Sequence, residues 1–361
     1  MWRPTGRRAF LRGQALAARG GGRAGAAART GGRAGAAALL ALTALTAGGA
    51  AGQATPPAEP PPEWGPTAAD YTNVPYPHPV AFLEFAVHGE DVRLAYMDVA
   101  PAGAANGRTV MLFHGMNFFA AAFEPTIAAL TAAGFRVVAI DRLGYGRSSK
   151  PIIPYNLHLA ATNAKRVLDH LGIERAAVVG HSMGGMVAAR FAFSYPETAT
   201  RLVLVNPIGL TDPRGSRPWR DPQEAYAGVL RSTGYPSILR NHMRYYPEWR
   251  PEYLQWVRYQ YGLTLSGEWP RLARVRALQQ QILYEDPVVH DWPHIRTPAL
   301  VIGGEEDGPR FPELARNAAA TLPDAELVLF PGVGHIPQFE IPERFHAELI
   351  RFLAAGPTVG G

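Results

Sequence analysis

The chain contains no cysteine, which excludes disulfide scaffolds, thiolate metal sites and cysteine nucleophiles. Lysine is almost as scarce: Lys150 and Lys165 are the only two, and no glycine-rich phosphate-binding loop ends in lysine. The 11 histidines are scattered and show no His-Glu-x-x-His spacing. We therefore expect an activity that needs neither a metal nor a cofactor.

Basic charge is concentrated at one end of the chain. The formal net charge is +5, but the first 54 residues hold eight arginines and no acidic residue. The remainder has 27 basic residues against 30 acidic ones, a formal charge of −3. A mildly acidic body lacks the electrostatic footprint of a nucleic-acid-binding protein, so we expect no nucleic-acid partner. With 361 residues, 47% hydrophobic and 18% charged, the composition is that of a globular protein.

Residues 1–54 resemble an export signal. Residues 6–12 resemble the twin-arginine signal, in which two arginines precede Phe-Leu and a further basic residue. The apolar run at 36–47 is shorter than the roughly 20 residues of a membrane span, and small residues that suit a signal peptidase follow it. The stretch between them, where residues 21–28 recur at 31–38, departs from the signal pattern. We expect a periplasmic or secreted protein with no membrane span in its mature chain; a basic tail on a cytoplasmic protein is the alternative.

A proline-rich linker at 55–70 precedes a regular alternation of strand-like and helix-like stretches. This alternation predicts an α/β fold, with a mainly parallel, mixed sheet of eight strands and helices on both faces. Residues 71–207 and 293–357 form the expected core. The expected strands are 80–87, 92–99, 109–113, 136–141, 175–180, 202–206, 299–303 and 326–330, and the expected helices are 121–133, 155–171, 183–195, 312–322 and 342–354.

The alternation is interrupted at 208–292, which holds five of the seven tryptophans and eight of the fourteen tyrosines. Leu254, Val257 and Tyr261 follow helical spacing, so we expect a helical cap. Insertions in α/β sheets usually lie over the strand ends where ligands bind. The cap is therefore expected to be a lid with an aromatic substrate pocket beneath it, although a subdomain that only buries its own aromatic residues is the simpler alternative.

The most informative pattern is Gly-x-Ser-x-Gly at 180–184, between an expected strand and an expected helix. Such a junction forces a tight turn that lifts Ser182 above the sheet. Gly180 and Gly184 have no side chains, so the strand and the helix can approach closely around that turn.

With this turn, the sequence resembles the α/β-hydrolase family over about residues 79–355. The resemblance implies that Ser182 is the nucleophile and that acid and histidine follow it in the chain. Asp307 follows a late strand in a Gly-x-x-Asp ending, with Glu306 as the alternative acid, and His335 follows the last strand. The histidine would take the serine proton, and the acid would hold the imidazole tautomer and stabilise the imidazolium.

The resemblance also implies an oxyanion hole. Its donors would be the backbone N–H groups of Met183, directly after the nucleophile, and of Met116, in a loop that resembles the family's His-Gly-x loop. The Asn117 side chain is a further possible donor. His114 and His181 are expected to support loops rather than to catalyse. The Asp-x-x-Gly-x-Gly-x-Ser stretch at 141–148 matches another loop of the family and is expected to be structural.

A serine nucleophile disfavours haloalkane dehalogenases and epoxide hydrolases of this fold, which use an aspartate there. We expect a carboxylesterase that acts with water on a small to medium, fairly apolar ester through an acyl-enzyme. A C–C bond hydrolase, lactonase or perhydrolase of the same fold is the alternative, and a non-catalytic ligand-binding protein is less favoured. The oligomeric state is left open by the sequence.

Overall fold

The computed structural model describes residues 55–356. The predicted export signal at 1–54 lies outside this range. Two consecutive strands, β1 (Ala81–Val87) and β2 (Glu90–Val99), open the ordered sheet and pair with each other antiparallel. Among the described residues, no helix is long and apolar enough to cross a membrane.

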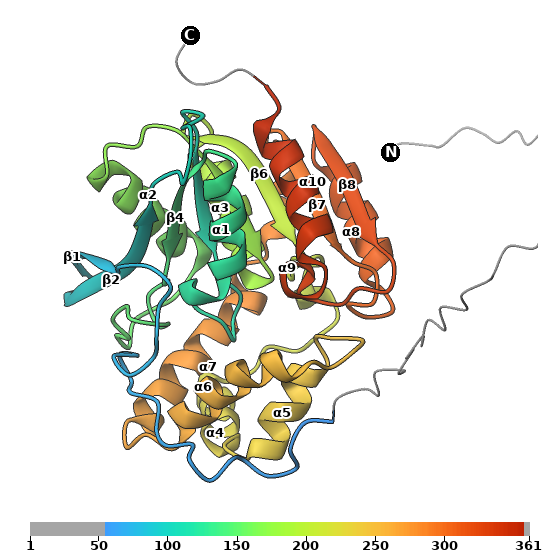
Figure 1. Cartoon of the computed structure of the whole chain (residues 1–361). Helices are drawn as coiled ribbons and strands as arrows, with labels where there is room; N and C mark the ends of the chain where they lie inside the picture. The colour runs from blue at the N-terminus through green and yellow to red at the C-terminus, as the bar shows by residue number, and fades with distance from the viewer. Residues whose placement is uncertain (1–54, 357–361) are drawn as a thin grey trace, which may run out of the picture. The chain divides into compact units, whose positions relative to one another are not determined.

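The sheet has eight strands in the order β1-β2-β4-β3-β5-β6-β7-β8 (Figure 1). After β2, which pairs antiparallel with β4, every pairing is parallel. This arrangement confirms the predicted mixed, mainly parallel α/β sheet. The remaining strands are β3 (Thr109–Phe113), β4 (Arg136–Ile140), β5 (Ala176–His181), β6 (Ala199–Val205), β7 (Ala299–Gly304) and β8 (Ala325–Phe330).

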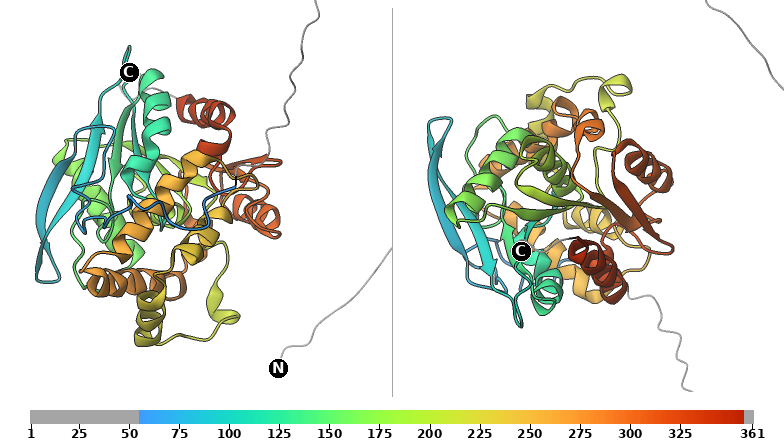
Figure 2. Two further views of the ribbon diagram at one scale, coloured as in Figure 1. Left: turned by 60° about the horizontal axis from the view of Figure 1, so that its bottom comes forward. Right: turned by 90° about the horizontal axis from the view of Figure 1, so that it is seen from above.

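Helices cover both faces of the sheet because its central strands are apolar on both sides (Figure 2). In β3, for example, Met111 and Phe113 pack toward one helical layer, whereas Val110 and Leu112 pack toward the other. The first layer is formed by α2 (Leu157–His170), α3 (Met183–Ser194) and α8 (Phe311–Thr321), and the second by α1 (Glu124–Ala132) and α10 (Pro342–Ala354).

The segment expected to form a helical cap leaves the sheet after β6 and returns before β7. Its helices gather at one end of the sheet, at the bottom of Figure 1. They bury an aromatic cluster that includes Tyr235, Trp256 and Trp269 and that also takes in Phe118 and Phe119 of the core. The cap helices are α4 (Pro222–Arg231), α5 (Tyr235–Met243), α6 (Leu254–Thr264) and α7 (Trp269–Glu285).

The proline-rich segment at 55–70 contains neither helix nor strand, but it packs against the cap. The Trp64 ring lies 5.9 Å from the Tyr235 ring, and the Tyr235 hydroxyl donates a hydrogen bond to the Pro57 carbonyl at 2.8 Å. The folded unit therefore includes this segment, whereas the sequence suggested a core that starts at Tyr71.

Candidate active site

Ser182 lies at the junction of β5 and α3, in a strained backbone conformation. Its φ is 56° and its ψ −120°, a region that residues with a side chain rarely adopt. A Cβ atom on Gly180 would lie 2.1 Å from the Gly184 carbonyl oxygen, and one on Gly184 would lie 2.0 Å from the Phe113 oxygen. Both glycines of the Gly-x-Ser-x-Gly pattern are therefore needed for the close approach that the sequence indicated.

Asp307 and His335 meet at the ends of β7 and β8. The His335 Nδ1 and Asp307 Oδ2 atoms are 2.7 Å apart, and both side chains are largely buried. Glu306 is exposed, and its backbone N–H donates to the Val333 carbonyl at 2.8 Å. Of the two acids considered from the sequence, the structure therefore brings Asp307 to the histidine. This contact leaves Nε2 as the nitrogen of His335 that is available to a nucleophile.

Asn206, which the sequence analysis missed, holds the acid from the end of β6. Its Nδ2 donates to Asp307 Oδ2 at 2.9 Å, and its Oδ1 accepts the Gly304 N–H at 3.1 Å. The residue is fully buried, with a φ of 40° that asparagine tolerates better than most residues. Its sequence signal was a polar residue directly after a buried strand.

The loop that carries His335 is tied down on both sides of the histidine. The Glu340 carboxylate accepts the Gly334 N–H at 2.8 Å and the Ile336 N–H at 3.0 Å. Burial raises the pKa of Glu340, although both backbone donors oppose this shift. The His335 N–H itself donates to the carbonyl of Tyr245, a cap residue, at 2.7 Å. Core and cap therefore both fix this loop.

The imidazole of His335 has aromatic neighbours on two sides. The Tyr245 ring stacks on it with a centroid distance of 5.0 Å and an interplanar angle of 27°, and the His181 ring lies 4.9 Å away. Burial, and then the proximity of His335, lower the pKa of His181 to about 3. His181 is therefore neutral near pH 7, and its Nε2 contacts the His335 carbonyl at 2.9 Å as a donor. This supports the loop role expected for His181.

The His-Gly loop after β3 reaches the serine from the other side. A Cβ atom on Gly115 would lie 3.1 Å from the Ser182 Cβ, so the absence of a side chain allows this approach. Met183 is the first residue of α3, and its N–H is among those without an acceptor inside the helix. Met116 directly follows Gly115 on this loop. Within the described residues, the Ser182 hydroxyl forms no hydrogen bond.

The Asn117 side chain is hydrogen-bonded to two cap residues, whereas the sequence suggested it as a further oxyanion donor. Its Nδ2 donates to the Tyr245 hydroxyl at 2.6 Å, and its Oδ1 accepts from the Arg276 guanidinium at 2.7 Å. Asn117, Met116 and Arg276 line a small cavity of about 30 Å³. The oxyanion loop is thus connected to the cap through Asn117.

His114 and Asp141 have structural partners. His114 Nε2 accepts the Arg142 N–H at 3.2 Å, so its Nδ1 is the nitrogen that donates to the Gly115 carbonyl at 2.8 Å. The Asp141 carboxylate accepts the N–H groups of Ala120 at 2.7 Å and Arg147 at 2.8 Å. These bonds fit the structural roles expected for both residues.

Three tryptophans of the cap lie in different surroundings. Trp219 is 55% exposed, so it points to solvent. Trp249 is buried against Tyr246 and Tyr253 within the cap. Only Trp256 of the three lines cavities next to the core. In the part of the chain that the structure describes, no three His, Asp or Glu side chains are grouped as a metal site would require.

Comparison with known proteins identifies the family. A sequence model of the alpha/beta hydrolase family matches residues 110–348. The crystal structure of a probable hydrolytic enzyme from Pseudomonas aeruginosa PAO1 is 38% identical, with a TM-score of 0.77, and the match covers 80% of this chain and 99% of that one. A 2-hydroxy-6-oxononadienedioate/2-hydroxy-6-oxononatrienedioate hydrolase from Paraburkholderia phymatum is 33% identical over 73% of this chain and 92% of its own. A putative carbamate hydrolase from a Caulobacter species is 29% identical over 72% and 95%.

Proposed function

The chain belongs to the alpha/beta hydrolase family, and we propose that it is a serine hydrolase that cleaves a small to medium, fairly apolar carboxylic ester. The observation that carries this proposal is the 2.7 Å contact of His335 Nδ1 with Asp307, together with a serine in a strained strand-to-helix turn whose preceding residue, His181, has its ring 4.9 Å from the His335 ring. A buried carboxylate on Nδ1 favours the tautomer in which Nε2 can accept a proton.

In the proposed reaction, Ser182 Oγ attacks the ester carbonyl while His335 Nε2 takes the hydroxyl proton. The carbonyl oxygen becomes an oxyanion, which the N–H groups of Met116 and Met183 would stabilise. Collapse of this intermediate breaks the ester C–O bond, and His335 returns the proton to the departing alcohol. Water then attacks the acyl-enzyme by the same steps and releases the acid, which restores the Ser182 hydroxyl.

The preference for an apolar substrate rests on the surroundings of the site. Phe118 lies next to His181, with ring centroids 5.9 Å apart, and next to Trp256 at 5.5 Å. Tyr245 covers one side of His335. A substrate that reaches Ser182 beneath the cap would therefore meet aromatic carbon, which favours apolar acyl or alcohol groups.

A second candidate is hydrolysis of a C–C bond in an anionic diketone, by the same serine and histidine. Arg276 contacts Asn117 at 2.7 Å, on the loop that carries Met116. A guanidinium that contacts the residue next to Met116 suits a substrate carboxylate. The Paraburkholderia relative is named for a dioate substrate, which supports this candidate further.

A fluorophosphonate probe and a substrate panel test the proposal. The native protein should be labelled at Ser182 and should hydrolyse p-nitrophenyl esters, whereas Ser182→Ala should lose both properties and remain folded. Ser216→Ala, at an exposed serine of the cap, is the matched control and should retain both. More than a few per cent of residual activity in Ser182→Ala would exclude its role as nucleophile. Faster turnover of a vinylogous 1,5-diketone carboxylate than of any ester would favour the second candidate.

We also propose, from the sequence pattern alone, that residues 1–54 direct export by the twin-arginine route. The mature chain should then begin between about residues 50 and 56. N-terminal sequencing of the protein from its native host tests this, and replacing Arg7 and Arg8 by lysine should retain the protein in the cytoplasm. A cytoplasmic chain that begins at Met1 would contradict the proposal.

A further inference from the structure

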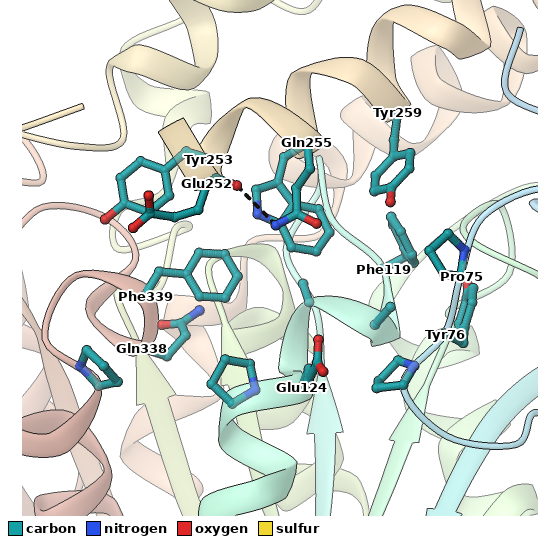
Figure 3. A pocket seen from close by; sticks show the side chains of 16 residues that line it. Pro75, Tyr76, Phe119, Glu124, Glu252, Tyr253, Gln255, Tyr259, Gln338 and Phe339 are labelled. Atoms are coloured by element: carbon teal, nitrogen blue, oxygen red, sulfur yellow. Dashed lines mark hydrogen bonds between the residues drawn. The ribbon is translucent and has the colours of Figure 1, made fainter. Parts of the chain in front are cut away.

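A pocket of about 380 Å³ opens where the cap meets the core, beside the proposed active site (Figure 3). Its cap side is the start of α6 and the turn before it, and its core side is the start of α1, near Glu124. The short helix α9 (Pro337–Glu340), directly after His335, completes the wall. We name this cavity the seam pocket.

One aromatic side chain connects the wall of the seam pocket to His181, the residue before the proposed nucleophile. Phe118 contacts two rings of the pocket wall, Trp256 at 5.5 Å and Phe339 at 6.3 Å between centroids. On its other side, it contacts His181 at 5.9 Å. None of Ser182, Asp307 and His335 lines the seam pocket, so it is a cavity distinct from the proposed triad.

Aromatic rings dominate the wall of the seam pocket. Trp256 and Phe339 stack nearly parallel, with an interplanar angle of 8° and centroids 5.7 Å apart. Phe119 meets Trp256 and Tyr259 edge to face, both at 5.7 Å. The six aromatic residues that line it are Tyr76, Phe119, Tyr253, Trp256, Tyr259 and Phe339.

The charges of the seam pocket all have one sign. Glu252, on the cap side, and Glu124, on the core side, are its charged lining residues, and no lysine, arginine or histidine lines it (Figure 3). Both glutamates are exposed, and neither forms a salt bridge within residues 55–356. The wall also contains Gln338, which is 4% exposed and whose Oε1 has no hydrogen-bond partner among the described residues. The polar groups thus provide negative charge and an unused acceptor.

Two guanidinium groups that contact residues of the wall or of α9 already have partners. Arg147 lies over the Tyr76 ring, 4.4 Å from its centroid, and its NH2 group donates to the Val74 carbonyl. Arg250 donates to the Glu340 carbonyl at 3.1 Å. Neither lines the seam pocket, so neither neutralises the two glutamates there. The Arg147 contact also shows that a ring of this wall already holds a cation on one face.

We propose that the seam pocket binds an organic cation with apolar substituents, of the quaternary ammonium class. Ring faces attract a cation whose charge is spread over methyl groups, and the attraction grows as the cation is desolvated. The two carboxylates add long-range attraction, while the rings disfavour small, strongly hydrated metal cations. This site does not depend on the reaction at Ser182.

The test compares two ligands of the same shape, 3-hydroxyphenyltrimethylammonium and its uncharged isostere 3-tert-butylphenol. Calorimetric titration of the whole protein should give a Kd at least tenfold lower for the cation. Ser182→Ala should bind it as the native protein does, which separates this site from the proposed catalysis. Equal affinity for the two ligands would overturn the proposal.

Two variants locate the site. The double variant Glu124→Gln, Glu252→Gln should raise the Kd of the cation at least fivefold and leave that of the phenol unchanged. The matched control, Glu84→Gln with Glu90→Gln, removes the same charge from exposed positions of β1 and β2 and should change neither Kd. Phe339→Leu keeps apolar volume but removes a ring. It should weaken binding of the cation more than binding of the phenol. Equal effects of the two double variants, or an unchanged cation Kd in Phe339→Leu, would contradict a site in the seam pocket.

Discussion

Asn206 offers the sharpest test of how the acid is held. Its Nδ2 donates to Asp307 Oδ2, the same oxygen that faces His335, and its Oδ1 accepts the N–H of Gly304. We choose Asn206→Gly because glycine adopts the native φ of 40° without steric cost, so the change removes the side chain and adds no backbone clash. Asn206→Gly also introduces no larger side chain at this fully buried position.

Two losses follow from Asn206→Gly. A hydrogen bond to a charged group contributes about 1.5–3 kcal/mol, and a buried N–H left without an acceptor costs about 1–3 kcal/mol. The free energy of unfolding should therefore fall by roughly 2.5–6 kcal/mol. If the transition state loses about 1.4 kcal/mol of stabilisation relative to the bound substrate, kcat falls about tenfold and KM changes little.

The assay is kcat and KM of ester hydrolysis per labelled serine, beside chemical denaturation. Asn163→Ala is the matched control, because it removes another buried asparagine side chain, on α2, away from the proposed site. The control should retain the native kcat per labelled serine, whatever its change in stability. A native kcat in Asn206→Gly, with only reduced stability, would refute the idea that Asn206 positions the acid.

Three further predictions follow from the same structure. Asp307→Asn should lower kcat by orders of magnitude, because the wrong imidazole tautomer would be favoured. Glu306→Gln should lower kcat only mildly. The reverse result in ester kinetics would identify Glu306 as the acid. Trp256→Phe should change relative kcat/KM across an ester chain-length series, by up to about 1–3 kcal/mol per discriminated group, and the exposed Trp219→Phe should not. Burial lowers the pKa of His346 to about 4. Neutral His346 therefore contributes stability above its unfolded pKa of about 6.5. This contribution is lost as the pH falls from 6.5 toward 4. Denaturation between pH 4 and 7 should therefore be less pH-dependent in His346→Gln, and an unchanged slope would contradict the assignment.

The strands β3 and β6 show how burial affects the prediction of strand ends from the sequence. Thr109–Phe113 was predicted with its observed bounds, because an unbroken apolar run between turn residues has few other interpretations. The start of β6 was placed at Leu202, whereas the strand begins at Ala199. Thr200 and Arg201 are only partly buried, so hydrophobicity carries no signal for the first residues of that strand. The helix expected at 121–133 begins as a 3₁₀ turn, and α1 itself starts at Glu124, with Pro125 in the first turn, where proline is tolerated.

The residues of the candidate site also differ in how clearly the sequence signals them. Ser182, Asp307 and His335 were predicted because each follows a recognisable strand, in an order that a known family shares. Tyr245 had no such signal, since it is one of eight tyrosines in an insertion without strands. Its importance comes only from tertiary contacts: its carbonyl accepts the His335 N–H, its ring stacks on the imidazole, and its hydroxyl accepts from Asn117. A single cap residue thus touches both the histidine loop and the oxyanion loop, so a displacement of the cap would disturb both at once. For that reason, the specificity of this hydrolase and the geometry of its proposed catalytic groups are expected to be coupled, and neither can be derived from strand patterns alone.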